Sequence, residues 1–418
     1  MRLKTQKEII FFYNIPIILF SLIPLFLITG PFLSDLAVSL ISVIFLIYCI
    51  KENNFIFFKN KYFYFFLIFW LYLILNSLFN NLNFDSLKIS IFYFRYAVFV
   101  VAILSLIKFD DKFLKYFYYS ILFCFIILIF DGFYQYFNGE NIIGFKSPNS
   151  YRVSSFFHND MVLGSYLSRL WPIFFGLSLI YLKKQNKFYM LVIFILSEVL
   201  IFLSGDRTAF FFLNLSGIFV IIFSERLLRL RFYILISSIF LIIVISYFNP
   251  IAKQRFIDQT LAQMNLVNLK KSDEKINIFS EQHNQHYVAA YKIFIDNKTF
   301  GVGVKNFRNF CNEEKYKTEF SCSTHPHNYY LQILSEIGIL GFGFLIIVLF
   351  FFCKYLTKHL IFKFNKKYYF SDFEICILSG ILIYLWPLAP TGNVFNNWLN
   401  IILILNIPLL ISSRNLSK

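Results

Sequence analysis

The stretch Ser323–Phe342, with the sequence STHPHNYYLQILSEIGILGF, closes a long polar segment and leads directly into an apolar run. Two histidines, His325 and His327, flank Pro326 at this junction. Proline disfavours helical backbone at the residue before it and is well accepted in the first turn of a helix, so a helix is expected to begin here. The junction therefore predicts a polar site where water meets the hydrocarbon of a membrane.

The composition of the chain excludes an ordinary soluble domain. Of its 418 residues, 58% are hydrophobic, and apolar runs of about 17–25 residues recur, each long enough to cross roughly 30 Å of hydrocarbon as a helix. No short leader with a cleavage site is recognisable, so the first run is expected to remain as a membrane helix. We predict an all-α polytopic membrane protein with about twelve transmembrane helices. The expected spans lie near residues 9–29, 32–50, 62–79, 87–107, 116–137, 161–182, 188–204, 207–224, 232–248, 328–353, 374–391 and 397–413.

The basic residues are distributed as in a membrane protein. The formal net charge is +16, but Lys and Arg fall in short clusters between apolar runs, so membrane lipids and not nucleic acid are the expected partners. About 22 of them flank the runs on one side, against Lys146, Arg152 and Arg207 on the other. Because short cytoplasmic loops carry the excess of basic residues, both termini are predicted to be cytoplasmic. An even number of spans requires the same.

One long loop, roughly Asn249–His327, falls on the outer side between the predicted ninth and tenth spans. About eighty residues is long for a passive connector, which indicates a lid or a binding subdomain. The loop is expected to be partly helical, because apolar and aromatic residues recur at helical spacing in HNQHYVAAYKIFIDN. The residues with this spacing are His283, Tyr287, Ala290, Tyr291 and Phe294. The chain is accordingly divided into residues 1–248, 249–327 and 328–418.

Two of the six cysteines, Cys311 and Cys322, lie in this loop about eleven positions apart. In an oxidising compartment they form a disulfide if the fold brings them together, and otherwise they are free thiols. The spacing does not decide between the two, because the geometry of the pair is invisible in the sequence.

The histidine pair has two interpretations. In the first, His327 is a general base at a helix N-terminus, which keeps its imidazole neutral, and His325 supports or replaces it. In the second, both are interfacial histidines that cap the helix continued by Asn328. Further along, Gly338 and Gly341 lie one turn apart and are expected to let another helix approach closely.

Glu336 is expected about 14 Å along the helix from His327 and roughly on the opposite face. It is therefore predicted to anchor a neighbouring helix or a loop, not to contact the histidine.

Arginines supply the candidates for anion binding. Arg207, in SGDRT, interrupts two apolar runs at the outer boundary, and a guanidinium group matches phosphate oxygens bidentately. The alternative is an interfacial arginine that snorkels and pairs with Asp206. Arg152 opens the loop before the sixth span at the same boundary.

Three ionisable residues, Arg95, Arg169 and Glu198, lie well inside apolar runs. A central arginine costs about 2.5–3.5 kcal/mol on the insertion scale, so each needs a partner or a wet cavity. We expect at least one arginine to line a polar cavity that opens outward, with Glu198 as a structural counter-ion. A purely structural ion pair is the alternative.

Motifs for metal, nucleotide and acyl-enzyme chemistry are absent from the sequence. It has no Cys/His zinc spacing, no HExxH, no P-loop and no G-x-S-x-G, so no metal and no other cofactor is expected. The two halves of the chain do not resemble each other, which disfavours a repeat-built transporter.

Several features occur together between residues 150 and 345. They are the run His327-Asn328-x-x-Leu331-x-x-x-x-Glu336-x-Gly338-x-x-Gly341, the stretch Ala289–Phe307 (AAYKIFIDNKTFGVGVKNF), Arg207 at the start of a span, and Arg152 before a Ser-rich stretch. This combination resembles the O-antigen ligase and O-antigen polymerase family of bacterial GT-C-type membrane glycosyltransferases. In that family the corresponding features are the signature run, an amphipathic helix with a G-x-G turn, the first essential arginine and its upstream loop.

One position departs from the family pattern. The family places a second arginine about four residues before an aromatic that corresponds to Tyr287, and here the position holds His283, with His286 nearby. Either histidine binds an anion when protonated, though more weakly at neutral pH. Arg308 is the alternative for this role.

The resemblance implies transfer of a glycan from undecaprenyl diphosphate to an acceptor at the periplasmic face of the bacterial inner membrane, without a cofactor. His327 or His325 would be the base, and Arg207 with Arg152 would bind the diphosphate. The acceptor is lipid A-core in a ligase and a second carrier-linked glycan in a polymerase, and the complete HNxxLxxxxExGxxG run favours the ligase. A protein O-oligosaccharyltransferase and a non-enzymatic lipid-glycan transporter are further alternatives.

Overall fold

The computed structural model of the chain describes residues 6–80, 83–148, 152–182, 187–225, 228–248, 253–263, 279–365, 367 and 369–416. Within these ranges every regular element is a helix, apart from one isolated β-bridge between Glu140 and Lys146. The predicted all-α class is therefore confirmed. Parts of two predictions lie outside the described residues. They are segments 249–252 and 264–278 of the long loop, and the basic residues Arg2, Lys4, Lys183, Lys184, Arg226, Lys366 and Lys418.

Eight helical segments in the described part of the chain are long and apolar enough to cross a membrane. They are α1–η1–α2 (Gln6–Ile28), α3 (Pro31–Lys51), α4 (Lys61–Phe79), α5 and α6 (Phe84–Phe92 and Phe94–Phe109), α7 (Leu114–Asn138), α8 (Leu163–Tyr181), α11 (Leu228–Phe248) and α16 (Tyr329–Phe364). Four further helices are not among these segments, namely α9 (Lys187–Leu203), α10 (Arg207–Phe223), α17 (Asp372–Leu385) and α18 (Asn397–Leu416), and the apolar part of α18 is Asn397–Ser413. The chain is thus a multi-spanning membrane protein. Each of the twelve predicted runs falls on a helix, and the number of true spans stays a prediction.

Two predicted boundaries are wrong. The helix α17 ends at Leu385, six residues before the predicted end, because Pro387 favours extended backbone at Trp386 (φ −77°, ψ 122°). The helix α16 continues to Phe364, eleven residues beyond the predicted end. Its last turns contain several lysines, which are good helix formers in water.

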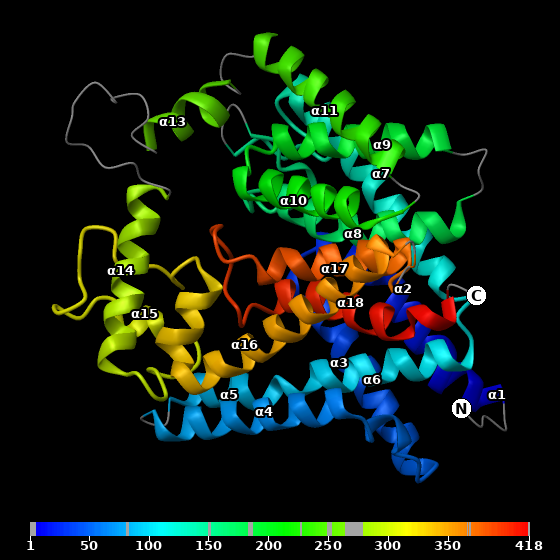
Figure 1. Cartoon of the computed structure of the whole chain (residues 1–418), viewed down its shortest axis with the longest axis vertical. Helices are drawn as coiled ribbons and strands as arrows, with labels where there is room; N and C mark the ends of the chain where they lie inside the picture. Colours follow the sequence, from blue (N-terminus) through cyan, green and yellow to red (C-terminus); the bar gives the residue numbers. More distant parts are fainter. Residues whose placement is uncertain are drawn as a thin grey trace.

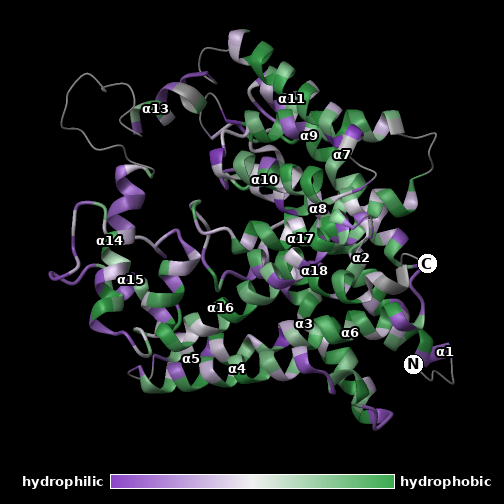
Figure 2. Cartoon of the chain, viewed as in Figure 1, coloured by the Kyte–Doolittle hydropathy of each residue, from purple (hydrophilic) through white to green (hydrophobic). Residues whose placement is uncertain are grey.

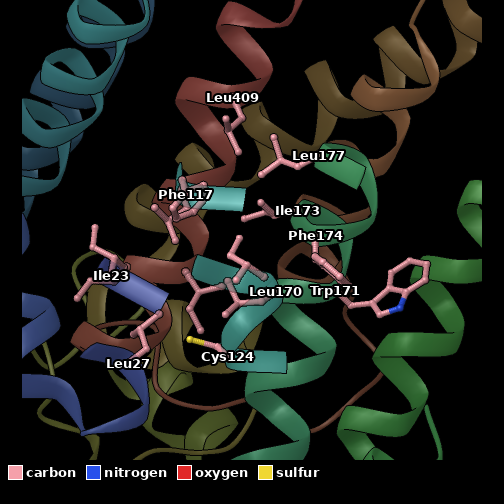
Figure 3. Close-up of a cluster of buried hydrophobic side chains, with 14 of the residues drawn as sticks. Ile23, Leu27, Phe117, Cys124, Leu170, Trp171, Ile173, Phe174, Leu177 and Leu409 are labelled. Atoms are coloured by element: carbon pink, nitrogen blue, oxygen red, sulfur yellow. The ribbon is translucent and has the colours of Figure 1, made fainter. Parts of the chain in front are cut away.

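The centre of the bundle is α8, whose residues from Leu163 to Ser178 are all buried except Ser165. It packs against α7, α9, α10 and α17, as expected of a helix that is apolar all round. Figure 3 shows part of this core, where Leu170 and Phe174 of α8 lie among side chains of α2, α7 and α18. Trp171 stacks on Phe175 with a ring separation of 4.8 Å.

The long loop forms a separate layer at one end of the helices. Its elements are η5 (Gln254–Asp258), α13 (Gln259–Gln263), α14 (Glu281–Asp296) and α15 (Phe307–Phe310). Both termini lie towards the opposite end (Figure 1). Hydrophilic residues gather on α14 and the loops around it, whereas the bundle is mainly hydrophobic (Figure 2).

Helix α14 is the amphipathic helix that the sequence predicts, but its buried face differs from the prediction in part. The buried side chains are His286, Tyr287, Ala289, Ala290 and Ile293, and Tyr291 is 55% exposed. The helix packs against α16, with the two small alanines on its buried side.

Helix α16 is interrupted at Gly338, whose φ of +67° and ψ of −171° are not helical. The turn before α15 docks at this interruption: Val302 N–H donates to Ser335 O (2.9 Å), and Ile339 N–H donates to Lys298 O (2.8 Å). A third bond runs from Gly303 N–H to Glu336 O (2.8 Å). These bonds satisfy backbone groups that the helix leaves unpaired.

We expected Gly338 and Gly341 to let a neighbouring helix approach closely. For Gly338 this expectation is wrong, because the segment that approaches it is the turn before α15 and not a helix. A side chain at Gly338 would meet the backbone of the turn, at 2.5 Å from Thr299 C and 2.6 Å from Phe300 N. At Gly341 the nearest atoms belong to Ile337 of the same helix. The glycine is needed at 338 because loop backbone, and not a helix, comes this close.

Glu336 ties the same turn to α16 through its side chain. It is 0% exposed, and its carboxylate accepts N–H bonds from Lys305 (3.1 Å) and Phe307 (3.3 Å), together with Gln332 Nε2–H (3.0 Å). The signature residues Glu336 and Gly338 thus hold the loop layer against the helix that follows His327.

Candidate active site

Four of the six histidines of the chain gather in one cluster where the loop layer meets the bundle. The His327 ring centroid lies 5.3 Å from that of His283, 5.4 Å from that of His286 and 4.1 Å from that of His325. Residues three apart share a helix face, so His283 and His286 project together from α14. His325 and His327 come from the segment that precedes α16. We call these four side chains the histidine cluster.

The loop between α17 and α18 fixes the position of the His325–His327 segment. Thr391 N–H donates to His327 O (2.8 Å), and Asn328 Nδ2–H donates to Pro387 O (2.9 Å). Asn328 also caps α16, because its Oδ1 accepts the N–H groups of Tyr330 (3.0 Å) and Leu331 (3.1 Å). The helix therefore begins one residue after Asn328.

His327 itself has a φ of +57°. This conformation is uncommon for a residue other than glycine, and such residues concentrate at functional sites. The segment around it holds the conformation in place, since Thr391 and the Tyr287 hydroxyl (3.4 Å) both donate to its carbonyl oxygen.

The two histidines of the pair differ in what they can do. His325 is buried, its Nε2–H donates to Thr391 O (3.2 Å), and its Nδ1 then accepts from Thr324 Oγ1 (2.9 Å). Both of its nitrogens are thus engaged. His327 is only partly buried, and its Nε2 lies 3.2 Å from Ser323 Oγ. A substrate can approach His327 and not His325, so His327 is the better candidate for a base.

The histidines are neutral at physiological pH. Burial, and then the neighbouring histidines, lowers the pKa of His327 to about 3. Burial lowers the pKa of His283 and of His325 to about 4, and that of His286 in the same direction. An imidazole must be unprotonated to accept a proton, and the cluster meets this condition. A pKa of about 3 also means that His327 is a weak base unless a bound anion raises its pKa.

Arg207 is the first residue of α10, and Arg152 bonds to the turn before it. Asp206 caps α10, because its Oδ1 accepts Ala209 N–H (3.0 Å), and Arg207 Nη1–H donates to Thr260 Oγ1 (2.9 Å). The charge of Arg207 is one of the causes that lower the pKa of His283. Arg152 Nε–H donates to Ser204 O (2.8 Å).

The pKa of Asp206 shows that Arg152 and Arg169 lie near its carboxyl group. Burial raises its pKa, and the N–H of Ala209 together with the charges of Arg152 and Arg169 opposes that rise. The structure therefore brings three guanidinium groups around the start of α10, those of Arg152, Arg169 and Arg207. Of these three residues, Arg169 is the one that belongs to α8.

Arg308 lies on another side of the histidine cluster. It is exposed, its Nη2–H donates to Thr324 O (3.3 Å), and its charge contributes to lowering the pKa of His325. Basic side chains thus flank the neutral imidazoles at both His283 and His325.

The buried charges of the bundle do not pair as the sequence suggested. Arg95 donates from Nη2 to Asp35 Oδ1 (2.7 Å), so it is held in an ion pair. Glu198 pairs with Arg231 (2.7 Å) at 1% and 0% side-chain exposure, and with neither Arg95 nor Arg169. The sequence predicts Arg231 among the basic residues of a loop, although it lies inside α11. Of the three predicted intramembrane charges, Arg169 alone has no carboxylate within ion-pair distance among the described residues.

Cys311 and Cys322 form a disulfide, with 5.1 Å between their Cα atoms. It closes the segment that leads to the His325–His327 pair. Among the residues that the structure describes, no three His, Cys, Asp or Glu side chains are arranged to hold a metal ion. An apolar groove of about 510 Å³ lies between α7 and α9, and its lining includes none of the residues of the histidine cluster.

Residues 191–353 match the protein family described as O-antigen ligase. The chain carries an O-antigen ligase domain. The matched segment runs from α9 into α16 and includes Arg207, the histidine cluster and the Glu336–Gly338 tie, whereas Arg152, Arg169 and Arg95 precede it. This match, together with the membrane-spanning helices, supports a membrane glycosyltransferase of the ligase and polymerase type, a type whose substrates are lipid-linked glycans. No curated protein matches the chain.

Proposed function

We propose that this protein is an O-antigen ligase-like glycosyltransferase that moves a glycan from undecaprenyl diphosphate to a lipid A-core acceptor. The reaction takes place at the periplasmic face of the bacterial inner membrane, with both termini cytoplasmic and residues 249–327 forming a periplasmic subdomain. One observation carries the proposal: the charge of Arg207 acts on His283, whose ring centroid lies 5.3 Å from that of the neutral His327.

In the proposed reaction His327 removes the proton of an acceptor hydroxyl. The freed oxygen attacks the anomeric carbon of the donor sugar, the bond from that carbon to the diphosphate oxygen breaks, and undecaprenyl diphosphate leaves. The proton stays on the imidazole and then passes to water, while the Ser323 hydroxyl, 3.2 Å from Nε2, can accept a hydrogen bond from the imidazolium. General-base catalysis of this kind contributes about 10²–10⁴-fold to a rate.

The basic side chains stabilise the leaving group. Arg207 and Arg152 bind the diphosphate, whose negative charge grows as the sugar leaves, and electrostatic stabilisation of such developing charge usually contributes more to catalysis than any other effect. His283 and His286 donate hydrogen bonds from their N–H groups, and Arg308 lies on the other side of the cluster. Because the arginines supply the positive charge and the diphosphate is itself a good leaving group, the proposal includes neither a metal nor a nucleotide.

The acceptor can be identified from lipopolysaccharide gel patterns of a strain that lacks the protein. A ligase predicts loss of the whole ladder of long bands while carrier-linked polymer is retained. A polymerase predicts lipid A-core that carries a single repeat unit. A ladder that is unchanged, with glycan missing from periplasmic proteins, would replace the proposal by protein O-glycosylation. An unchanged ladder with unchanged protein glycosylation would refute it.

A further inference from the structure

Arg169 of α8 is a buried cation whose surroundings differ from those of the other charges inside the bundle. Arg169 is 3% exposed to solvent. Arg95 and Arg231 each lie 2.7 Å from a carboxylate oxygen. Arg169 instead lies against two aromatic rings, with its guanidinium carbon 5.0 Å from the Phe212 centroid and 4.7 Å from that of Tyr384.

The hydrogen bonding of Arg169 is incomplete. Its Nε–H donates to Ser165 Oγ (3.1 Å), and its buried Nη1 has no hydrogen-bond partner among the residues that the structure describes. A buried charged donor without an acceptor is costly, and native proteins retain such groups where a ligand or another function requires them. The guanidinium also bonds to the Tyr384 side chain, so the unpaired Nη1 group is the part of Arg169 that indicates a ligand.

The position of Arg169 connects it to the candidate active site. Phe212 lies in the second turn of α10, which begins at Arg207, and Tyr384 stacks on Tyr329 with a ring separation of 6.4 Å. Tyr329 is the first residue of α16, two positions after His327. The cation thus lies among the first turns of the two helices that present Arg207 and His327.

The start of α8 gives the same placement. An added Cβ at Gly164 would lie 2.6 Å from Ser204 Oγ and 3.1 Å from Asp206 Cβ, so the first turn of α8 packs on the junction before α10. Arg169 is five residues further, about 7.5 Å along the helix axis. Arg169 therefore lies further into the bundle than Ser204 and Asp206, which pack on the first turn of α8.

We propose that Arg169 forms the inner end of the donor site, where its Nη1 group donates to a phosphate oxygen of a lipid-linked diphosphate. This inference rests on the proposed function, in which the donor carries such a group. Charge supports it: Arg152, Arg169 and Arg207 around the single carboxylate of Asp206 leave two positive charges, which match the two ionised phosphates of a diphosphate diester. The aromatic rings keep the guanidinium fixed and dry, which strengthens a charge-assisted bond.

The test is equilibrium binding to the purified full chain in lipid nanodiscs. Binding of undecaprenyl diphosphate, undecaprenyl monophosphate and phosphatidylglycerol is measured for the wild type, Arg169→Gln and Arg169→Lys. A hydrogen bond to a charged group contributes about 1.5–3 kcal/mol, so Arg169→Gln should weaken undecaprenyl diphosphate binding by about 10–150-fold. Arg169→Lys should recover part of this affinity. Arg95→Lys is the matched control, since Arg95 has its own carboxylate, and it should bind the diphosphate as the wild type does.

Three outcomes overturn the inference. They are unchanged diphosphate binding by a folded Arg169→Gln protein, an equal loss for phosphatidylglycerol, and an equal loss in Arg95→Lys. If Arg169→Gln does not insert into the membrane, Ser165→Ala is tested instead. This variant keeps the charge of Arg169 and removes the hydroxyl bonded to its Nε, so diphosphate binding should weaken by about 2–10-fold. Unchanged binding by Ser165→Ala would then overturn the inference. Binding is measured without transfer, so a wild type that binds the diphosphate but transfers no glycan refutes the proposed function alone.

Discussion

The substitution Gly338→Ala tests how the signature residues hold the loop layer against α16. At this position φ is +67° and ψ is −171°, a region essentially restricted to glycine, and placing another residue there costs about 1–3 kcal/mol. The added Cβ would also lie 2.5 Å from Thr299 C and 2.6 Å from Phe300 N, and closer still to Thr299 O. These are backbone atoms of a tightly bonded turn, so the turn has to move away.

Moving the turn breaks the bonds that dock it. Val302 N–H to Ser335 O, Gly303 N–H to Glu336 O and Ile339 N–H to Lys298 O are all 2.8–2.9 Å long, and each contributes about 0.5–1.5 kcal/mol net. Together with the backbone strain, the loss is about 3–7 kcal/mol of local stability. Because the turn is also tied to Glu336, we expect the loop layer to detach from α16 before the bundle unfolds.

The assay is unfolding of the detergent-purified protein, followed by hydrogen exchange of the backbone amides of the turn before α15 and of the start of α16. Gly343→Ala is the matched control in the same helix, because its φ is not positive and an added Cβ has no heavy atom within 4 Å. That change should be neutral or stabilise the helix by up to about 1 kcal/mol. Equal protection of the turn in Gly338→Ala and Gly343→Ala would show that docking of the loop layer does not depend on Gly338.

Three further changes have defined outcomes. Because burial lowers the pKa of His327 to about 3, kcat/KM should not fall through protonation of this base between pH 8 and pH 5, and a half-maximal rate near pH 6.5 would show an ordinary imidazole. The pKa of His327 is also lower in the folded protein than in the unfolded chain, so below about pH 6.5 the unfolded chain binds the proton more tightly. The free energy of unfolding should therefore be constant above that pH and should decrease towards pH 4 in an unfolding titration. Glu198→Gln leaves the buried Arg231 without its counter-charge and should cost about 3–5 kcal/mol in thermal unfolding without changing donor affinity; a changed affinity would place this pair in the site. Cys311→Ser removes a crosslink that spans 11 positions and should cost about 2–4 kcal/mol, seen as faster proteolysis of the segment before His325, whereas an unchanged cleavage rate would show that the disulfide does not stabilise that segment.

Local patterns in the sequence are sufficient to predict most of the fold. Every predicted apolar run lies on a helix, and the spacing of apolar residues identifies α14. Both predictions succeed because they depend only on residues that are close together in the sequence. The end of α17 is predicted too far along, although Pro387 marks it. This error hides Thr391, which the structure shows bonded to both His325 and His327.

The parts of the site that could not be predicted depend on contacts between distant segments. Arg231 resembles a loop residue because Arg229 stands two positions before it, and only the packing of α11 against α9 reveals its pairing with Glu198. Likewise, the spacing of His283 and His286 places them on one face of α14, but their proximity to His327 follows from the docking of the turn at Gly338. No sequence pattern indicates the aromatic rings around Arg169.

The proposed chemistry is tested by the rate of glycan transfer by His327→Ala, measured with purified protein, a carrier-linked donor and lipid A-core. His158→Asn is the control, since His158 is exposed and lies outside the histidine cluster. If His327 is the base, transfer falls by at least about 100-fold in His327→Ala, with membrane insertion and donor binding retained, and it is unchanged in His158→Asn. Transfer by His327→Ala within twofold of the wild type would show that His327 is not the base.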